Sequence, residues 1–168
     1  MDAEKFTKKS LEVIESCEKL AYEYNNQELT QAHLMYALVT VEDSLIAKLL
    51  TNMGINMDAF TGECEKLVAN RPKVSGGQLF TSPEFSKALI QAEKEAKQMG
   101  DDYISVEHIF LGLLEKADKD IKRVINAYGI TRGKFLEVLA NIRGNRKVES
   151  DNPEDTYDAL NKYGYNLV

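Results

Sequence analysis

The strongest constraint on this fold is that the chain contains a duplicated sequence. Shifting the sequence by 75 positions aligns it with itself, without a gap, from about Ser10 to Ala69. A period this long indicates a duplicated small domain, because solenoid repeats run about 20–50 residues. We therefore expect two similar halves related by a pseudo-two-fold axis, with a groove between them as the natural binding site. The aligned pairs include His33 with His108, Leu38 with Leu113, Ile46 with Ile121, Gly54 with Gly129 and Phe60 with Phe135.

Each half has the pattern of four helices. Apolar residues at Leu11, Ile14, Cys17 and Ala21 lie on one helical face, and the same spacing returns from Phe85 onward. Residues with a side-chain oxygen stand where the helices begin, as N-caps do. No segment shows the alternation of a strand, so the sequence predicts an all-α fold of eight helices. The predicted caps are Thr7, Thr30, Ser44, Asn56 or Asp58, then Ser82, Ser105, Asp118 and Thr131.

Composition divides the chain into a domain and a tail. The first 144 residues are long enough to bury a core, with repeat one at about 5–70 and repeat two at about 80–144. Residues 145–155 are polar and predict a flexible linker. An apolar pattern resumes at 156–168 and predicts the truncated start of a following module.

Charge and cysteine usage restrict the function classes. The net charge of −6 argues against a nucleic-acid-binding surface, which needs a basic face. No apolar stretch approaches the length of a membrane span, and the polar start shows no targeting signal. Cys17 and Cys64 occupy apolar helical positions and predict reduced core thiols in a cytoplasmic protein.

The two histidines favour a structural interpretation. His33 and His108 each follow a hydroxyl cap by three residues, the position from which a side chain can bond back to the helix start. Neither has a cysteine or carboxylate at a convincing metal-ligand spacing, so no metal site is predicted. No credible catalytic triad or dyad is present, and the phosphate-binding G-x-x-x-x-G-K-[ST] motif is absent from the chain.

The motifs resemble those of a known family. Leu-Thr-x-x-His-Leu at 29–34, its echo Ile-Ser-Val-Glu-His-Ile at 104–109, and Gly-Ile after the third helix of each half resemble the Clp N-terminal domain, over about residues 5–144. The segment Asn-Pro-Glu-Asp-Thr-Tyr-Asp-Ala-Leu-Asn-Lys-Tyr-Gly at 152–164 is similar to the join between this domain and the first AAA+ module in ClpB-type disaggregases. An Arg-Asp pair is usual in that family where Tyr165 and Asn166 stand.

The resemblance implies a non-catalytic substrate-binding domain, tethered above a hexameric ATPase ring. It implies weak binding of unfolded or aggregated polypeptides, cooperation of the full-length protein with the DnaK chaperone system, and ATP and magnesium in the full-length protein but no cofactor in this part. The isolated chain is expected to be a monomer, with neither nucleic acid nor membrane as a partner.

Seven residues are predicted to bind substrate. The resemblance places the polar positions Thr7, Ser82, Asp101 and Glu107 around the groove between the halves, although capping alone would also explain them. Three apolar residues, Phe80, Phe85 and Leu89, mark the start of the fifth helix. Most such residues belong to a core, and we expect Phe80 or Phe85 to form the groove edge and Leu11 to be core.

Two alternatives remain open from the sequence. The first is a domain of a protease-linked Clp ATPase that docks a folded adaptor, which the tail after Asn152 disfavours. The second is a small enzyme in which Glu107 acts as base with His108 beside it. A deep closed pocket around Glu107 would favour the enzyme, and an open shallow groove would contradict it.

Overall fold

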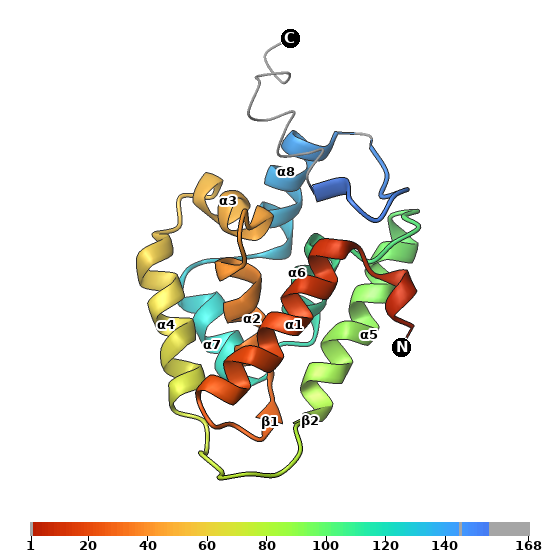
Figure 1. Ribbon diagram of the computed structural model, residues 1–168. Helices are drawn as coiled ribbons and strands as arrows, with labels where there is room; N and C mark the ends of the chain where they lie inside the picture. The colour runs from red at the N-terminus through yellow and green to blue at the C-terminus, as the bar shows by residue number, and fades with distance from the viewer. Residues whose placement is uncertain (1, 145, 155–168) are drawn as a thin grey trace.

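The computed structural model describes residues 2–144 and 146–154. Eight α-helices occur in this part of the chain, four in each repeat, after a 3-10 turn at Ala3–Lys5 (Figure 1). The predicted all-α fold is confirmed. The first repeat holds α1 (Lys8–Glu23), α2 (Gln31–Thr40), α3 (Leu45–Asn52) and α4 (Met57–Ala69), and the second holds α5 (Pro83–Gln98), α6 (Val106–Glu115), α7 (Lys119–Ala127) and α8 (Arg132–Arg143).

Every helix begins at a residue whose side chain caps it. Six of the predicted caps accept a backbone N–H of the first turn through a side-chain oxygen, among them Thr7 from Ser10 and Asn56 from Ala59. Thr30 and Ser105 instead form capping boxes, in which the Nδ1 atoms of His33 and His108 accept the cap N–H at 3.0 and 2.9 Å. The duplicated histidines are therefore helix-start residues, as predicted.

In each repeat, the segment that precedes the first helix pairs with the other repeat. Strand β2 (Phe80–Thr81), which precedes α5, pairs in parallel with β1 (Glu28–Leu29) of the first repeat. Phe6, which precedes α1, forms the matching bridge to Ile104 of the second repeat. Adding 75 to Phe6 and Leu29 gives Thr81 and Ile104, so the two contacts are copies. The sequence pattern missed these strands because two residues are too short to show alternation.

This exchange creates two equivalent places where the repeats cross. At one, the N–H of Thr7 donates to the carbonyl of Ile104 at 3.0 Å, and at the other the N–H of Ser82 donates to the carbonyl of Leu29 at 2.8 Å. We name them the N-terminal crossing (Thr7, Asp101, Glu107) and the loop crossing (Asn26, Phe80, Ser82). A pseudo-two-fold relation between the repeats follows directly from these paired contacts.

The core is continuous between the repeats. The paired helices α2 and α6 are buried along most of their lengths and lie inside the surrounding helices (Figure 1). Phe60, Phe110 and Phe135 are fully buried, as are both predicted core thiols, Cys17 and Cys64. Burial raises the pKa of Cys64 to about 12, which keeps its thiol protonated at neutral pH.

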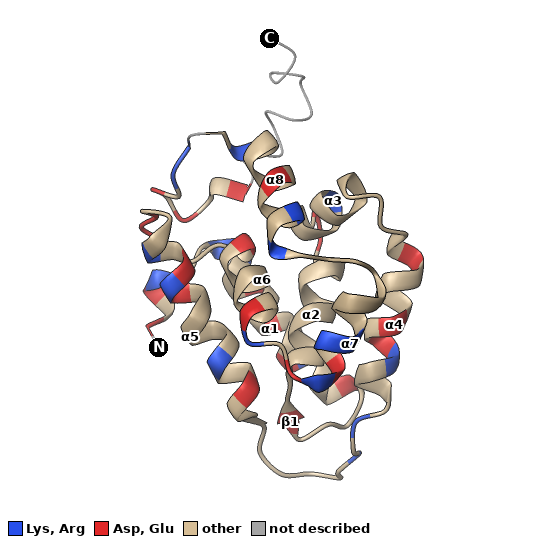
Figure 2. Ribbon diagram, turned by 180° about the vertical axis from the view of Figure 1, so that it is seen from behind, with Lys and Arg blue, Asp and Glu red and all other residues tan. Residues whose placement is uncertain are grey.

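The surface carries both signs of charge. Figure 2 shows acidic and basic positions interspersed along α5 and α7. Ion pairs form at the surface, for example between Arg71, which follows α4, and Asp120 of α7, at 2.6 Å. Within the described part of the chain, no helix is both long and apolar enough to cross a lipid bilayer.

After α8 the chain returns to the domain. Residues 146–154, blue in Figure 1, lie beside the N-terminal end of α1, where the carbonyl of Asp151 accepts the N–H of Lys8 at 2.8 Å. The mobility that composition predicts for 145–155 stays a prediction. The module start predicted at 156–168 lies outside the described residues.

Candidate functional site

The predicted site residues divide between the two crossings and the core. Thr7, Asp101 and Glu107 meet at the N-terminal crossing, and all three are buried. Phe80 and Ser82 lie at the loop crossing, where Phe80 is 52% exposed and Ser82 is buried. Phe85 is a core residue at 2% exposure, so Phe80 alone of that pair forms an exposed edge. Leu89 and Leu11 are half-buried and pack against the core.

Thr7 has two roles at the N-terminal crossing. Its Oγ1 accepts the N–H of Ser10 at 3.1 Å and so caps α1. The same hydroxyl is 2.9 Å from Oε2 of Glu154, to which it donates. A threonine that only capped a helix would not need the second contact. The side chain therefore connects α1 to the segment that follows α8.

Asp101 is the hub of a buried polar network. Its Oδ2 lies 2.7 Å from Nε2 of His108, and its Oδ1 accepts from Arg143 and from the N–H of Val148. Burial alone would raise the pKa of this carboxyl, but the hydrogen bonds from His108, Val148 and Arg143 hold it below its ordinary value. Asp101 is thus an ionised structural anchor at neutral pH.

Glu107 is fully buried in the first turn of α6. Its Oε2 lies 3.5 Å from Nη1 of Arg143, and neither of its carboxyl oxygens has a hydrogen-bond partner among the described residues. Buried carboxylates normally have such partners, because losing water is costly. Burial, followed by repulsion from Glu107, raises the pKa of nearby Glu154 to about 7. The N-terminal crossing therefore concentrates negative charge that is incompletely neutralised.

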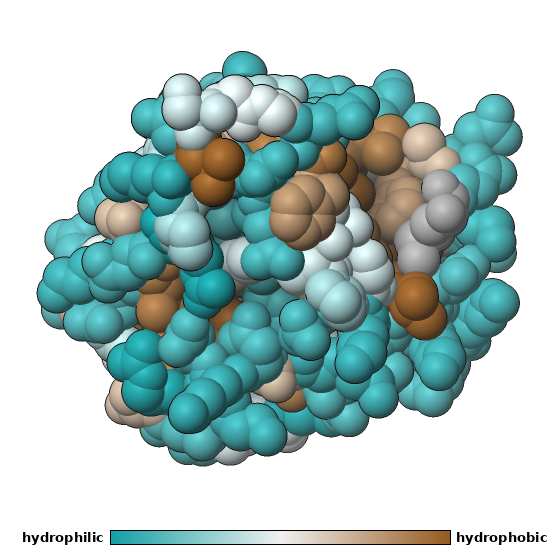
Figure 3. All heavy atoms as spheres, turned by 90° about the horizontal axis from the view of Figure 1, so that it is seen from below, coloured by the Kyte–Doolittle hydropathy of each residue, from teal (hydrophilic) through white to brown (hydrophobic). Residues whose placement is uncertain are grey.

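The loop crossing is more apolar and open. A cavity of about 190 Å³ lies there, lined by Asn26, Gln27, Glu28, Arg71, Pro72, Val74 and Phe80. Val74 is 42% exposed, so two exposed apolar side chains, Val74 and Phe80, border this cavity. Figure 3 views this end of the molecule and shows apolar patches among hydrophilic residues. A single apolar side chain fits a cavity of this size.

The ring nitrogens of both histidines are engaged in hydrogen bonds within the domain. Both ring nitrogens of His108 are engaged, Nδ1 with the N–H of Ser105 and Nε2 with Asp101. His33 is held likewise by Thr30 and Asn26. Among the described residues, no group of three or more His, Cys, Asp and Glu side chains is placed to hold a metal ion.

Three residues of the N-terminal crossing are not among the predicted site residues. Arg143 lies at the end of the second repeat, and Val148 and Glu154 lie within the predicted linker at 145–155. All three are buried, at 3%, 0% and 4% exposure. The one apolar residue in an otherwise polar segment, Val148, was the available signal. It could not show which surface the segment contacts.

Comparison with known proteins identifies the family to which this chain belongs. The chain belongs to the Clp repeat (R) N-terminal domain family, whose model matches residues 5–128. Within that family it is similar to the chaperone protein ClpB. It is 40% identical over its whole length to ClpB of Clostridium tetani and 41% identical to ClpB of Nitratidesulfovibrio vulgaris. The chain spans 20% of the length of each of these relatives.

Solved structures show the same fold. The Hsp104 N-terminal domain from Candida albicans superposes with a TM-score of 0.79 at 20% identity, covering 89% of this chain and 99% of that one. The N-terminal domain of the ClpV1 ATPase from E. coli superposes with a TM-score of 0.62 at 15% identity, covering 95% of this chain and 85% of that one.

Proposed function

We propose that this chain is the N-terminal client-binding domain of a ClpB-type, ATP-dependent protein disaggregase. It binds exposed apolar segments of unfolded or aggregated proteins weakly and passes them to the hexameric ATPase ring. The ATP and magnesium chemistry belongs to the rest of the longer protein, which cooperates with the DnaK system in the cytoplasm. This part of the chain is a monomer that acts without a cofactor. The observation that carries the proposal is the exposed Phe80 beside the cavity at the loop crossing.

The loop crossing suits clients that are defined by apolarity rather than by sequence. Phe80, Val74 and Pro72 offer an apolar surface, and Arg71 and Glu28 border it with both signs of charge. One buried aromatic contact is worth about 1–2 kcal/mol, which gives only weak affinity at a single site. Six copies on one ring would add avidity, because neighbouring domains raise the local concentration of sites.

The polar residues have a complementary role in this proposal. Thr7, Asp101 and Glu107 at the N-terminal crossing orient an extended backbone through hydrogen bonds, while Ser82 positions Phe80 by capping α5. Phe85 and Leu89 support the loop crossing from the core. The adaptor-docking alternative predicts a different behaviour, namely binding of a folded protein and indifference to unfolded chains.

Equilibrium binding of fluorescently labelled β-casein, an unfolded polypeptide, tests the proposal. Phe80→Ser should weaken binding by on the order of fivefold to tenfold, because it removes about 1 kcal/mol of apolar contact. Tyr22→Ser is the matched control, since Tyr22 is a 65% exposed aromatic residue on α1 that does not line the cavity. Equal affinities of the two variants and the parent chain would contradict the loop crossing as the client site.

A further inference from the structure

The segment 146–154 crosses the same surface that the proposed function assigns to an extended client backbone. We propose that this segment is an internal ligand of the N-terminal crossing, and that it must leave before a client can occupy the crossing. The docking itself stands on the contacts of the segment. The competition with client rests on the proposed function.

The centre of the segment is held as a bound peptide would be. Val148 donates its N–H to Oδ1 of Asp101 at 3.0 Å, and its carbonyl accepts the N–H of Asp102 at 2.8 Å. Its side chain is fully buried. Backbone bonds on both sides with one buried apolar side chain are the pattern by which proteins bind extended peptides. The N-terminal crossing can therefore hold an extended peptide, and in this structure it holds residues of the same chain.

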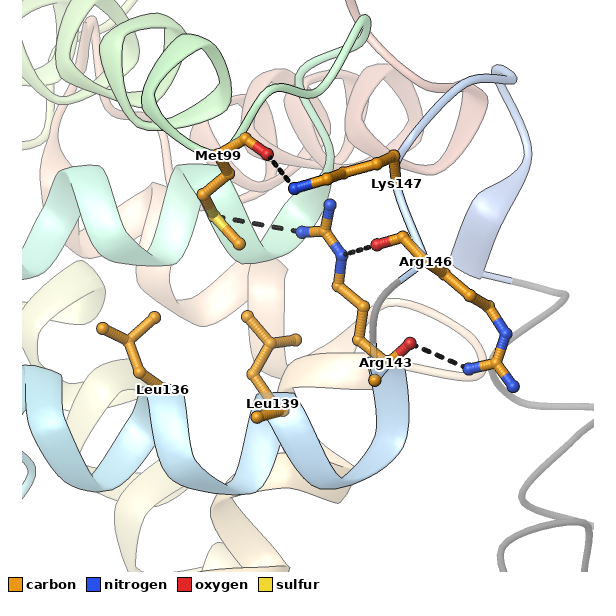
Figure 4. A pocket seen from close by; sticks show the side chains of 8 residues that line it. Met99, Leu136, Leu139, Arg143, Arg146 and Lys147 are labelled. Carbon is orange, nitrogen blue, oxygen red and sulfur yellow. Dashed lines mark hydrogen bonds between the residues drawn. The ribbon is translucent and has the colours of Figure 1, made fainter.

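Basic side chains fix the start of the segment. Lys147 Nζ donates to the carbonyl of Met99 at 2.7 Å, and Nε of Arg143 donates to the carbonyl of Arg146 at 2.8 Å (Figure 4). These contacts border a cavity of about 330 Å³, whose apolar lining includes Met99, Leu136 and Leu139. Exposed lysine and backbone contacts of this kind are individually weak, so the start of the segment can open without disturbing the core.

The end of the segment satisfies two helix starts at once. The carbonyl of Asp151 accepts the N–H of Lys8, the first residue of α1, at 2.8 Å. Oε2 of Glu154 accepts the N–H of Val106, the first residue of α6, at 3.2 Å, and the hydroxyl of Thr7 at 2.9 Å. First-turn N–H groups lack partners within their helix and attract negative charge. Glu154 therefore supplies what a peptide carboxylate would supply.

The charge at this end makes docking reversible. Asp101, Glu107 and Glu154 are three buried acids; the buried guanidinium of Arg143 pairs with Asp101 and Glu107, and His108 is bound to Asp101. Lys8 Nζ lies 3.9 Å from a carboxylate oxygen of Asp151. Oε1 of Glu154 and both oxygens of Glu107 have no hydrogen-bond partner in the described chain. An ionised Glu154 is therefore repelled by Glu107 and is only partly compensated by its two donors.

The sign of the resulting pH dependence follows from linkage. Burial, then Glu107, raises the pKa of Glu154 from 4.5 to about 7 when the segment is docked. The docked state therefore binds the proton more tightly than the released state does. Docking is fully favoured below about pH 4.5 and loses this contribution as the pH rises through about 7.

Two alanine variants of the 168-residue chain test the proposal, with two separate readouts. Glu154→Ala removes the buried acid, and Glu149→Ala makes the same change at an exposed position of the same segment. Amide hydrogen exchange without client reports docking, through the N–H groups of Lys8, Asp102 and Val106. Affinity for labelled β-casein reports competition. Circular dichroism and the exchange of core amides in α2 and α6 check that both variants fold.

We expect Glu154→Ala to speed exchange of the three amides and to tighten β-casein binding, each by on the order of tenfold, because it removes the acceptor of the Val106 N–H and the Thr7 hydroxyl. Glu149→Ala should leave both unchanged. Val148→Asp, which disrupts the centre of the segment, should act like Glu154→Ala. Unchanged exchange in both Glu154→Ala and Val148→Asp would overturn the docking. Faster exchange with unchanged β-casein affinity would overturn the competition. Absence of β-casein binding in every variant would count against the proposed function and, with it, the competition, while the exchange rates would still decide the docking.

Discussion

The ring of His108 is bonded through Nε2 to the buried carboxylate of Asp101 at 2.7 Å. The equivalent ring of the first repeat, His33, is bonded through Nε2 to the amide oxygen of Asn26 at 2.9 Å. The duplication has therefore kept the geometry of the helix start while its charge has diverged. Arg143, Glu107 and Glu154 gather around the charged copy, and the neutral copy lies beside the open loop crossing.

His33 should titrate far below an ordinary histidine. Burial, helped by the positive charge of Arg71, lowers its pKa from 6.5 to about 4. Below about pH 6.5 the unfolded chain binds a proton at this histidine that the folded chain does not bind. The free energy of unfolding should therefore decrease as the pH is lowered from about 6.5 to about 4. The loss from this residue is on the order of 3 kcal/mol. The pH dependence of its ring resonances in NMR checks this, and a midpoint near 6.5 would contradict it.

Asp101→Asn tests what the charge difference between the repeats contributes to stability. It places in the second repeat the residue type that the first repeat has at the equivalent position, Asn26. The variant leaves the guanidinium of Arg143 buried with Glu107 as its remaining anion. We expect the free energy of unfolding to fall by about 2 kcal/mol. Asp102→Asn, at the exposed neighbouring position, should change it by less than about 0.5 kcal/mol. Urea unfolding at pH 7 makes the comparison, and equal stabilities would show that the buried pair adds nothing.

Gly112→Ala should damage the contact between α5 and α6. A Cβ at this position would lie 2.3 Å from the carbonyl oxygen of Ala88 and 3.0 Å from the nitrogen of Ala92. Both neighbours are helix backbone and cannot move aside, so we expect a loss of about 2–3 kcal/mol. Gly62→Ala, within α4, meets nothing within 4 Å and should stabilise by about 0.5–1 kcal/mol. A melting temperature of Gly112→Ala equal to or above that of the parent chain would refute the close packing.

Arg132→Ala should destabilise the fold, because it leaves the buried carboxylate of Glu95 without its cation. Its guanidinium binds Glu95 through two contacts, at 2.6 and 2.9 Å, and the side chain of Glu95 is 2% exposed. We expect a loss of about 2 kcal/mol. The control Arg123→Ala breaks an exposed pair with Asp120 at 3.6 Å, and it should cost less than about 0.5 kcal/mol. Similar losses in the two variants, measured by urea unfolding, would argue against a special role for Glu95.

Most of the fold could be predicted because its signals are local. Caps such as Thr30 and Ser105 act within one helical turn, and Gly54 and Gly129 adopt the positive φ that ends a helix. Because the sequence is duplicated, these caps and glycines each occur in both repeats. The strand exchange at Phe6 and Phe80 escaped prediction, since pairing between residues far apart leaves no mark in a two-residue segment.

The candidate site was predictable only in part. Family resemblance places Thr7, Ser82, Asp101 and Glu107 around one groove. The structure brings three of them to the N-terminal crossing, whereas Ser82 lies at the loop crossing. Phe85 carries the same apolar character as Phe80, and only packing shows that one is core and the other exposed. Glu154 lies 147 positions from its partner Thr7, and the sequence shows no pattern that would pair them.

Client binding can be mapped by NMR chemical shifts, with the labelled 168-residue chain titrated by unlabelled β-casein. We expect shifts at Val74 and Phe80 of the loop crossing, and at Lys8, Asp102 and Val106 as the internal segment is displaced. Shifts confined to the outer faces of α4 and α7, or absent at about 1 mM β-casein, would contradict client capture between the repeats.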